Sequence, residues 1–208
     1  MKHVWMKGST DHTLVMLHGT GGNEYDLIDI AKMIDPNANI LSIRGNVLES
    51  GMPRFFKRIA PGVFDLDSLV EETKNLYDFI QKSEQTYHIK RENMTIIGYS
   101  NGANIAGSIL LHEDHPFKSA VLWRPMVPLK KNELNDLSDV HIFIIASKQD
   151  PIVKEEESKE LDKMLRLRGA HSILTWVESG HQLTMIDIEL TKAWYENQVK
   201  RDISIDVL

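Results

Sequence analysis

Short apolar runs alternate along this chain with longer segments whose apolar residues have the spacing of a helix. The apolar runs are residues 13–17, 39–43, 94–99, 120–123, 141–146 and 172–177, and the segments with helical spacing are 24–34, 67–88, 101–111, 154–168 and 184–200. This alternation predicts βαβ units, in which mostly parallel strands form a central sheet and helices cover both of its faces. Residues 3–6 are expected to add an edge strand, so the predicted fold class is α/β.

The size and charge of the chain narrow the classes of function. Its 208 residues fit one domain, residues 1–208, and contain no internal repeat. The formal net charge of −6, without any basic run, argues against a nucleic-acid partner. No run reaches the roughly 18 apolar residues of a membrane span, and residues 1–8 lack the apolar stretch of a signal peptide, so the expected location is the cytoplasm. The absence of cysteine excludes disulfides, thiolate zinc sites and a cysteine nucleophile, and neither a metal site nor a cofactor is expected.

The sequence Gly98-Tyr99-Ser100-Asn101-Gly102 matches the pattern Gly-x-Ser-x-Gly at the point where an apolar run ends and a helical segment begins. A nucleophile elbow needs this context, because its sharp turn requires small flanking residues and lifts the serine hydroxyl above the end of the strand. The alternative is a glycine-rich turn in which the serine only caps the following helix. The position favours Ser100 as a nucleophile.

An acid and a base follow Ser100 in the chain order that this kind of site requires. Asp150 comes just after the run ending at residue 146, and His181 comes just after the run ending at residue 177. A serine needs a base to accept its proton, and a carboxylate fixes the tautomer of the imidazole. Taken alone, Asp150 before Pro151 also suits a turn or a helix cap, and Glu178 is a rival acid.

A glycine-rich turn, His18-Gly19-Thr20-Gly21-Gly22, follows the first core run. It is expected to supply one backbone N–H of an oxyanion hole, with Thr20 as the candidate, while the N–H of Asn101 supplies the other. A phosphate-binding loop is the alternative, but no Lys-Ser or Lys-Thr follows the turn.

Several stretches together resemble the carboxylesterase/phospholipase subfamily of α/β-hydrolases, which includes bacterial dienelactone-hydrolase-like proteins and the acyl-protein thioesterases. These stretches are Leu17-His18-Gly19-Thr20-Gly21-Gly22-Asn23-Glu24, Arg44-Gly45-Asn46-Val47, Gly51-Met52-Pro53-Arg54-Phe55-Phe56, Gly98-Tyr99-Ser100-Asn101-Gly102-Ala103-Asn104, Asp150-Pro151-Ile152-Val153 and Ser179-Gly180-His181-Gln182-Leu183. The resemblance implies a single-domain α/β-hydrolase with the same catalytic trio and the same oxyanion donors. Asn101, where the thioesterases carry Gln, is more similar to the bacterial esterase branch.

The surroundings of the trio predict the kind of substrate. Only 17 residues, 124–140, separate two core runs, which is too short for a cap domain, so the site should be open. The long segment 44–62 is expected to form one wall of the pocket through Met52, Phe55 and Phe56, and Arg54 is expected to meet a substrate carboxylate or phosphate. Packing of both phenylalanines on the core is the alternative. The other wall is assigned to Trp123 and Met126.

An open apolar pocket favours hydrolysis of short-chain or aryl esters, so the expected partner is a small-molecule ester. Thioesterase or lysophospholipase activity with the same trio stays open, as does a non-catalytic protein that binds a small molecule. A homodimer is also left open, and residues 201–208 have no assigned role beyond an added edge strand or a frayed end.

Overall fold

A computed structural model describes residues 1–60, 62–129 and 135–198. A seven-stranded sheet in the order β1-β3-β2-β8-β9-β10-β11 forms its centre, and only β1 runs antiparallel to its neighbour. These strands are β1 (His3–Met6), β2 (Thr13–Leu17), β3 (Asn39–Ile43), β8 (Met94–Tyr99), β9 (Ser119–Trp123), β10 (His141–Ser147) and β11 (His171–Val177). The predicted α/β class and edge strand are confirmed.

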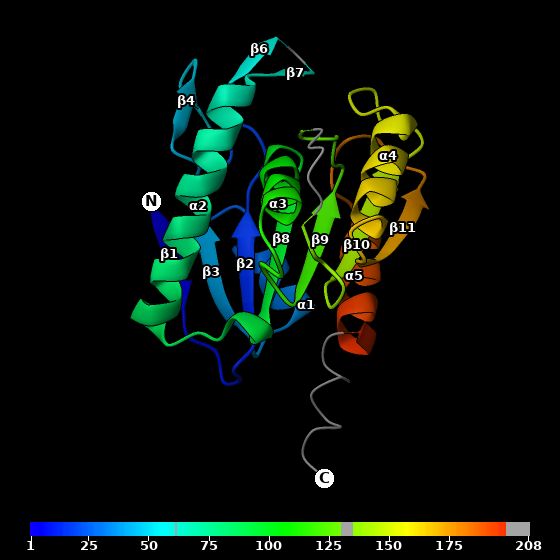
Figure 1. Ribbon diagram of the computed structural model, residues 1–208. Coiled ribbons are helices and arrows are strands. Elements are labelled where there is room, and N and C mark those ends of the chain that lie inside the picture. Colours follow the sequence, from blue (N-terminus) through cyan, green and yellow to red (C-terminus); the bar gives the residue numbers. More distant parts are fainter. Residues whose placement is uncertain (61, 130–134, 199–208) are drawn as a thin grey trace.

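Helices lie on both faces of the sheet (Figure 1). One face carries α2 (Leu66–Tyr87), α3 (Asn101–His112) and α4 (Glu155–Arg166), and the other carries α1 (Ile28–Ile34) and α5 (Met185–Gln198), while a short 3-10 helix (Arg91–Asn93) precedes β8. None of the helices in the described parts of the chain has the length and apolar character needed to cross a membrane.

Alternate residues of the inner strands feed two separate cores, which explains why these strands are apolar throughout. In β2, Val15 and Leu17 pack with α2 and α3, whereas Leu14 and Met16 pack with α1 and α5. A strand buried on both faces has no polar side, so its sequence becomes a continuous apolar run. This is the physical reason that the strand positions could be predicted closely.

The segment 44–62 differs from the predicted irregular loop. It forms a hairpin of β4 (Val47–Glu49) and β5 (Met52–Arg54), followed by β6 (Arg58–Ala60), which pairs with β7 (Val63–Phe64). The first hairpin turns through Ser50 and Gly51, whose φ values of 51° and 80° match the left-handed backbone of a tight two-residue turn. Both hairpins stand beyond the carboxyl ends of the parallel strands (Figure 1).

The chain order places a crevice at this same end of the sheet. From β2 the chain moves outward to β3, and it later returns to the opposite side of β2 as β8. At such a reversal the loops after the two neighbouring strands diverge, which is where open α/β sheets bind ligands. The loops in question hold the glycine-rich turn and Ser100. The described parts of the link between β9 and β10, residues 124–129 and 135–140, contain no helix or strand. Residues 201–208 lie outside the described residues.

Candidate active site

Ser100 lies on a sharp turn between β8 and α3. Its φ of 51° is in the left-handed region, which residues other than glycine rarely adopt. The turn is so tight that a Cβ on Gly98 would lie 2.4 Å from the Gly102 carbonyl oxygen. A Cβ on Gly102 would lie 2.2 Å from the carbonyl oxygen of Leu17 in β2. Both glycines of the Gly-x-Ser-x-Gly pattern are therefore required by close backbone contacts.

The three predicted residues form one line of hydrogen bonds. His181 Nε2 lies 2.9 Å from Ser100 Oγ, and His181 Nδ1 lies 2.8 Å from Asp150 Oδ2. A carboxylate can only accept, so Nδ1 carries the proton and Nε2 accepts from the serine hydroxyl. The Asp150 side chain is almost fully buried, whereas the imidazole keeps 15% of its surface exposed, toward the pocket.

The two carboxylate oxygens of Asp150 have different partners. Oδ1 accepts hydrogen bonds from the N–H groups of Ile152 and Val153 at 2.8 and 3.0 Å, while Oδ2 faces His181. Asp150 thus holds a turn with one oxygen and contacts the imidazole with the other, so the turn does not exclude the predicted role beside His181. Its turn bonds hold the second oxygen toward the histidine.

Arg124, which the sequence analysis missed, holds the loop that carries His181. Its guanidinium donates to the Gly180 and Gln182 carbonyl oxygens at 3.3 and 3.4 Å, and to Ser179 Oγ at 2.9 Å. It also forms a fully buried ion pair with Asp187 of α5 at 2.8 and 3.0 Å. Arg124 has a φ of 56°, an unfavourable value that these contacts maintain. The backbone on both sides of the imidazole is therefore bound to one rigid group.

His18 shapes the glycine-rich turn after β2. Its Nδ1 lies 2.6 Å from the Gly19 carbonyl oxygen, and its Nε2 accepts from the Gly45 N–H at 3.1 Å. Burial lowers the pKa of His18, which keeps the ring neutral and able to accept at Nε2. The Gly21 N–H donates to the Pro53 carbonyl oxygen at 2.9 Å, so the turn is also bound to β5.

The two predicted oxyanion donors remain available for a ligand. Within the described ranges, neither the Thr20 N–H nor the Asn101 N–H donates to a protein acceptor. Asn101 is the first residue of α3, where helices leave N–H groups without an intrahelical partner. Its side-chain Oδ1 accepts from the Phe55 N–H at 2.7 Å, which binds the helix start to the segment after β5.

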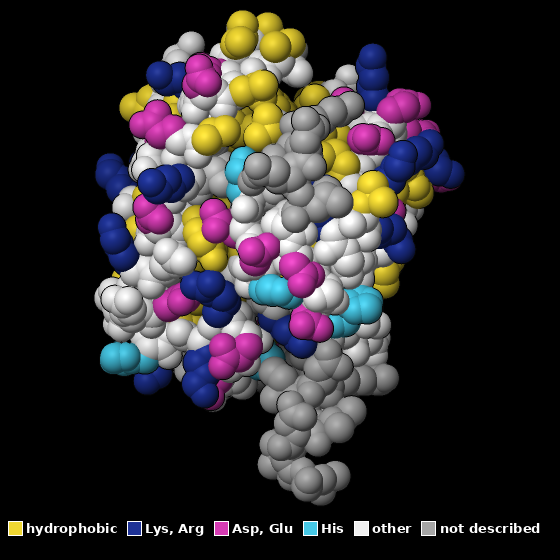
Figure 2. Space-filling model, in the orientation of Figure 1, with side chains coloured by type: hydrophobic (Ala, Val, Ile, Leu, Met, Phe, Trp, Pro, Cys, Tyr) yellow, Lys and Arg dark blue, Asp and Glu magenta, His cyan; other side chains and the backbone are white. Residues whose placement is uncertain are grey.

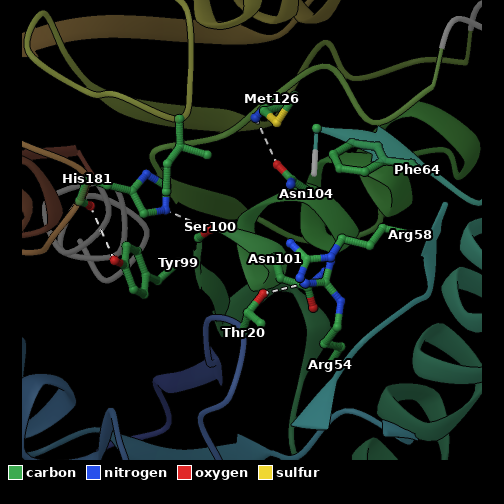
Figure 3. Close-up of a pocket in the computed structure, with 12 residues that line it drawn as sticks. Thr20, Arg54, Arg58, Phe64, Tyr99, Ser100, Asn101, Asn104, Met126 and His181 are labelled. Carbon is green, nitrogen blue, oxygen red and sulfur yellow. Dashed lines mark hydrogen bonds between the residues drawn. The ribbon is translucent and has the colours of Figure 1, made fainter. Parts of the chain in front are cut away.

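A cavity of about 300 Å³ opens beside Ser100 and His181 (Figure 3). Asn104 helps to shape it, because its Oδ1 accepts from the Met126 N–H at 2.8 Å. Among the predicted substrate-binding residues, Arg54 and Met126 line the cavity. The wall also contains residues that the sequence analysis did not select: Arg58, Gly62, Phe64, Tyr99, Asn104 and Ile152.

The assignment of Phe55, Phe56 and Trp123 to the pocket walls is wrong. All three side chains are fully buried: the two phenylalanines pack in the core on the α2 and α3 face, and Trp123 donates from Nε1 to Thr191 Oγ1 of α5 at 2.9 Å. Met52 is half-exposed and packs beside Gly21 rather than lining the cavity. Apolar side chains suit both the wall of a pocket and the core, so their apolar character alone does not predict which of the two they join.

The two hairpins beyond the sheet expose apolar side chains. Leu48, Ile59 and Val63 of the two hairpins are at least half exposed, and Ile152 is also exposed where it reaches the cavity. Figure 2 shows hydrophobic side chains gathered at this end of the molecule. In the parts of the chain that the structure describes, no three histidine or acidic side chains are grouped as metal ligands.

The sheet order and the tight Gly-x-Ser-x-Gly turn between β8 and α3 have the arrangement of an α/β-hydrolase. Residues 4–192 match the model of the phospholipase/carboxylesterase family, and the chain belongs to this family.

Similar proteins extend this result. The chain is 47% identical over 199 residues to MhqD of Bacillus subtilis, which is named only as a hydrolase; the match covers 96% of this chain and 100% of MhqD. A carboxylesterase from Bacillus cereus has a similar crystal structure, with a TM-score of 0.92, 47% identity, and coverage of 94% of this chain and 93% of that one. The structure of YahD with malic acid gives a TM-score of 0.90 at 34% identity, over 94% and 98% of the two chains. The predicted family and α/β-hydrolase fold are confirmed.

Proposed function

We propose that this protein is a serine carboxylesterase that hydrolyses short-chain or aryl esters through an acyl-serine intermediate. The observation that carries the proposal is the hydrogen-bonded line from Asp150 through His181 to Ser100, which ends at the cavity. This arrangement supplies a nucleophile, a base within reach of its proton, and an acid that fixes the tautomer of the base.

In the first half of the reaction, Ser100 Oγ attacks the carbonyl carbon of the ester while His181 Nε2 accepts the hydroxyl proton. The carbonyl oxygen becomes an oxyanion, and the unpartnered N–H groups of Thr20 and Asn101 are its donors. The intermediate then collapses, and the alcohol leaves with the proton that His181 returns. The products are an acyl group on Ser100 and a free alcohol.

In the second half, a water molecule gives a proton to His181 and attacks the acyl carbon. The second tetrahedral intermediate expels Ser100 Oγ, which recovers its proton from His181, and the carboxylic acid is released. Asp150 stabilises the imidazolium in both halves without being protonated itself. The cavity volume of about 300 Å³ and the described link without a helix support small substrates rather than long lipids.

A panel of esters tests this proposal. We expect p-nitrophenyl acetate and phenyl acetate to be hydrolysed faster than p-nitrophenyl laurate, and we expect Ser100→Ala to reduce the rate by about 10³-fold or more. Acetyl thioesters and lysophospholipids belong in the same panel, because a preference for either would assign the site to that substrate class. Hydrolysis of no ester by folded protein would contradict the proposal and favour a binding role.

A further inference from the structure

Two guanidinium groups lie side by side in the wall of the cavity. Arg54 is at the end of β5 and Arg58 is at the start of β6, and both line the space that Ser100 and His181 border (Figure 3). They are bridged by one carboxylate, since Arg58 Nε donates to Glu49 Oε1 at 2.7 Å and Arg54 Nε lies 3.4 Å from Glu49 Oε2. From this cluster, we infer that the enzyme selects esters that carry a free carboxylate, bound by Arg54 and Arg58.

Hydrogen bonds in the cluster leave donors unused on the side of the cavity. Arg54 Nε donates to the Phe56 carbonyl oxygen at 3.2 Å, and its Nη1 donates to Thr20 Oγ1 at 2.7 Å. Among the described residues, none accepts from Arg54 Nη2 or from either Nη of Arg58. Guanidinium groups match a carboxylate because their N–H groups can donate to both of its oxygens.

The charge of the cluster also calls for an anion. Arg54 is almost fully buried, and desolvation lowers its pKa, with a further lowering by the nearby charge of Arg58 that Glu49 opposes. Two cations and one anion leave one positive charge without a partner in this group. A singly charged carboxylate balances that charge, whereas the dianion of a phosphate monoester exceeds it.

The arginine cluster lies next to the proposed oxyanion site. Thr20 connects the cluster to that site, since its side chain accepts from Arg54 and its backbone N–H is a proposed oxyanion donor. Because the arginines and Ser100 line one cavity, a small molecule whose ester carbonyl meets Ser100 has its carboxylate within the same space as the two guanidinium groups. This inference rests on the proposed esterase activity and names the substrate class of the same site.

Matched substrate pairs test the inference. One pair is 3-acetoxybenzoate and its neutral methyl ester, with the charge on the alcohol side. The other is monophenyl adipate and phenyl hexanoate, with the charge on the acid side. We expect kcat/KM for the carboxylate member of at least one pair to exceed that of the neutral member by about tenfold or more.

Variants of three neighbouring charges identify the source of any preference. Arg58→Met should abolish most of the preference, so that kcat/KM for the carboxylate ester approaches that for its neutral partner. Glu49→Gln should increase the preference for carboxylate esters, because the Glu49 carboxylate that competes with the substrate for the two arginines is replaced by a neutral amide. Lys57→Met is the matched control, since Lys57 is an exposed cation beside the cluster that does not line the cavity.

Each outcome supports or overturns the inference. Equal kcat/KM for both members of both pairs would overturn it. A loss of the carboxylate preference in Lys57→Met as large as that in Arg58→Met would also overturn it. Faster hydrolysis of 4-acetoxyphenyl phosphate than of either carboxylate ester would overturn the carboxylate assignment. These failures leave the esterase proposal standing, whereas the absence of hydrolysis of every ester, neutral ones included, would instead contradict the esterase proposal.

Discussion

Replacement of Arg124 by lysine separates the positioning of His181 from the stability of the fold. Lysine keeps the positive charge beside buried Asp187, so it avoids the cost of about 3–5 kcal/mol for an unpaired buried anion. Its ammonium group lacks the planar set of donors that a guanidinium has. It therefore cannot donate at the same time to Asp187 and to the three loop residues that Arg124 binds, which are Ser179, Gly180 and Gln182.

The size of the effect follows from the lost contacts. Loss of about two hydrogen bonds from a charged donor to the loop weakens its hold on His181 by about 1.5–3 kcal/mol, allowing for partial replacement by water. Each 1.4 kcal/mol is about a factor of ten in the population of the productive imidazole position. We therefore expect kcat in Arg124→Lys to fall by about 10- to 100-fold. KM should change little, because Arg124 does not line the cavity.

The assay is steady-state hydrolysis of p-nitrophenyl acetate together with the rate of fluorophosphonate labelling, and both rates should fall in parallel. Arg168→Lys is the control, since Arg168 is also buried but binds Asn135 and the Met164 carbonyl oxygen, away from the site. It should reduce the free energy of unfolding without a comparable loss of labelling. A labelling rate in Arg124→Lys within twofold of the wild-type rate would refute the positioning role.

Three further predictions concern the turn, the acid and a buried histidine. Gly102→Ala places a Cβ 2.2 Å from the Leu17 carbonyl oxygen, so urea denaturation should show a loss of about 2 kcal/mol or more; unchanged stability would contradict the close contact. Asp150→Asn should lower kcat by about 10⁴-fold with a normal unfolding midpoint, because the amide disturbs the tautomer of His181 but preserves the turn; retention of a tenth of the activity would contradict this role. The lowered pKa of His18 means that only the unfolded chain binds a proton just below its ordinary pKa of about 6.5. Stability should be full above that pH and decrease as the pH falls below it, and His18→Gln should flatten this part of the curve of unfolding free energy against pH; an unchanged slope would contradict the assignment.

The sequence was most informative where burial on both faces leaves a continuous apolar run. The inner strands were therefore predicted to within about a residue at each end. Ser100 and Asp150 follow the inner strands β8 and β10, and His181 follows the edge strand β11. The three were predicted to lie together because parallel strands bring their carboxyl ends to one edge of the sheet, and the structure places them within hydrogen-bond distance. The chain order of the three residues added the second constraint.

Side-chain direction in the connecting segments was beyond what the sequence could supply. Phe55 and Phe56 are buried in the core, whereas Arg58 lines the cavity. In a long strand, the alternation of apolar and polar residues would predict which side chains face the core, but the short hairpins of this segment do not preserve that alternation. Arg124 was missed for a different reason. An arginine directly after a strand suggests an exposed loop, and its burial depends on Asp187, which is 63 residues away in the chain.

Covalent labelling of the serine tests the central claim most directly. The full chain is treated with a fluorophosphonate, which reacts with a serine that a neighbouring base activates, and the modified peptide is located by mass spectrometry. We predict a single adduct on Ser100 in the wild-type protein, and no labelling in either Ser100→Ala or His181→Ala. Folded wild-type protein that stays unlabelled, or an adduct on another residue, would contradict the assignment of Ser100 as the nucleophile.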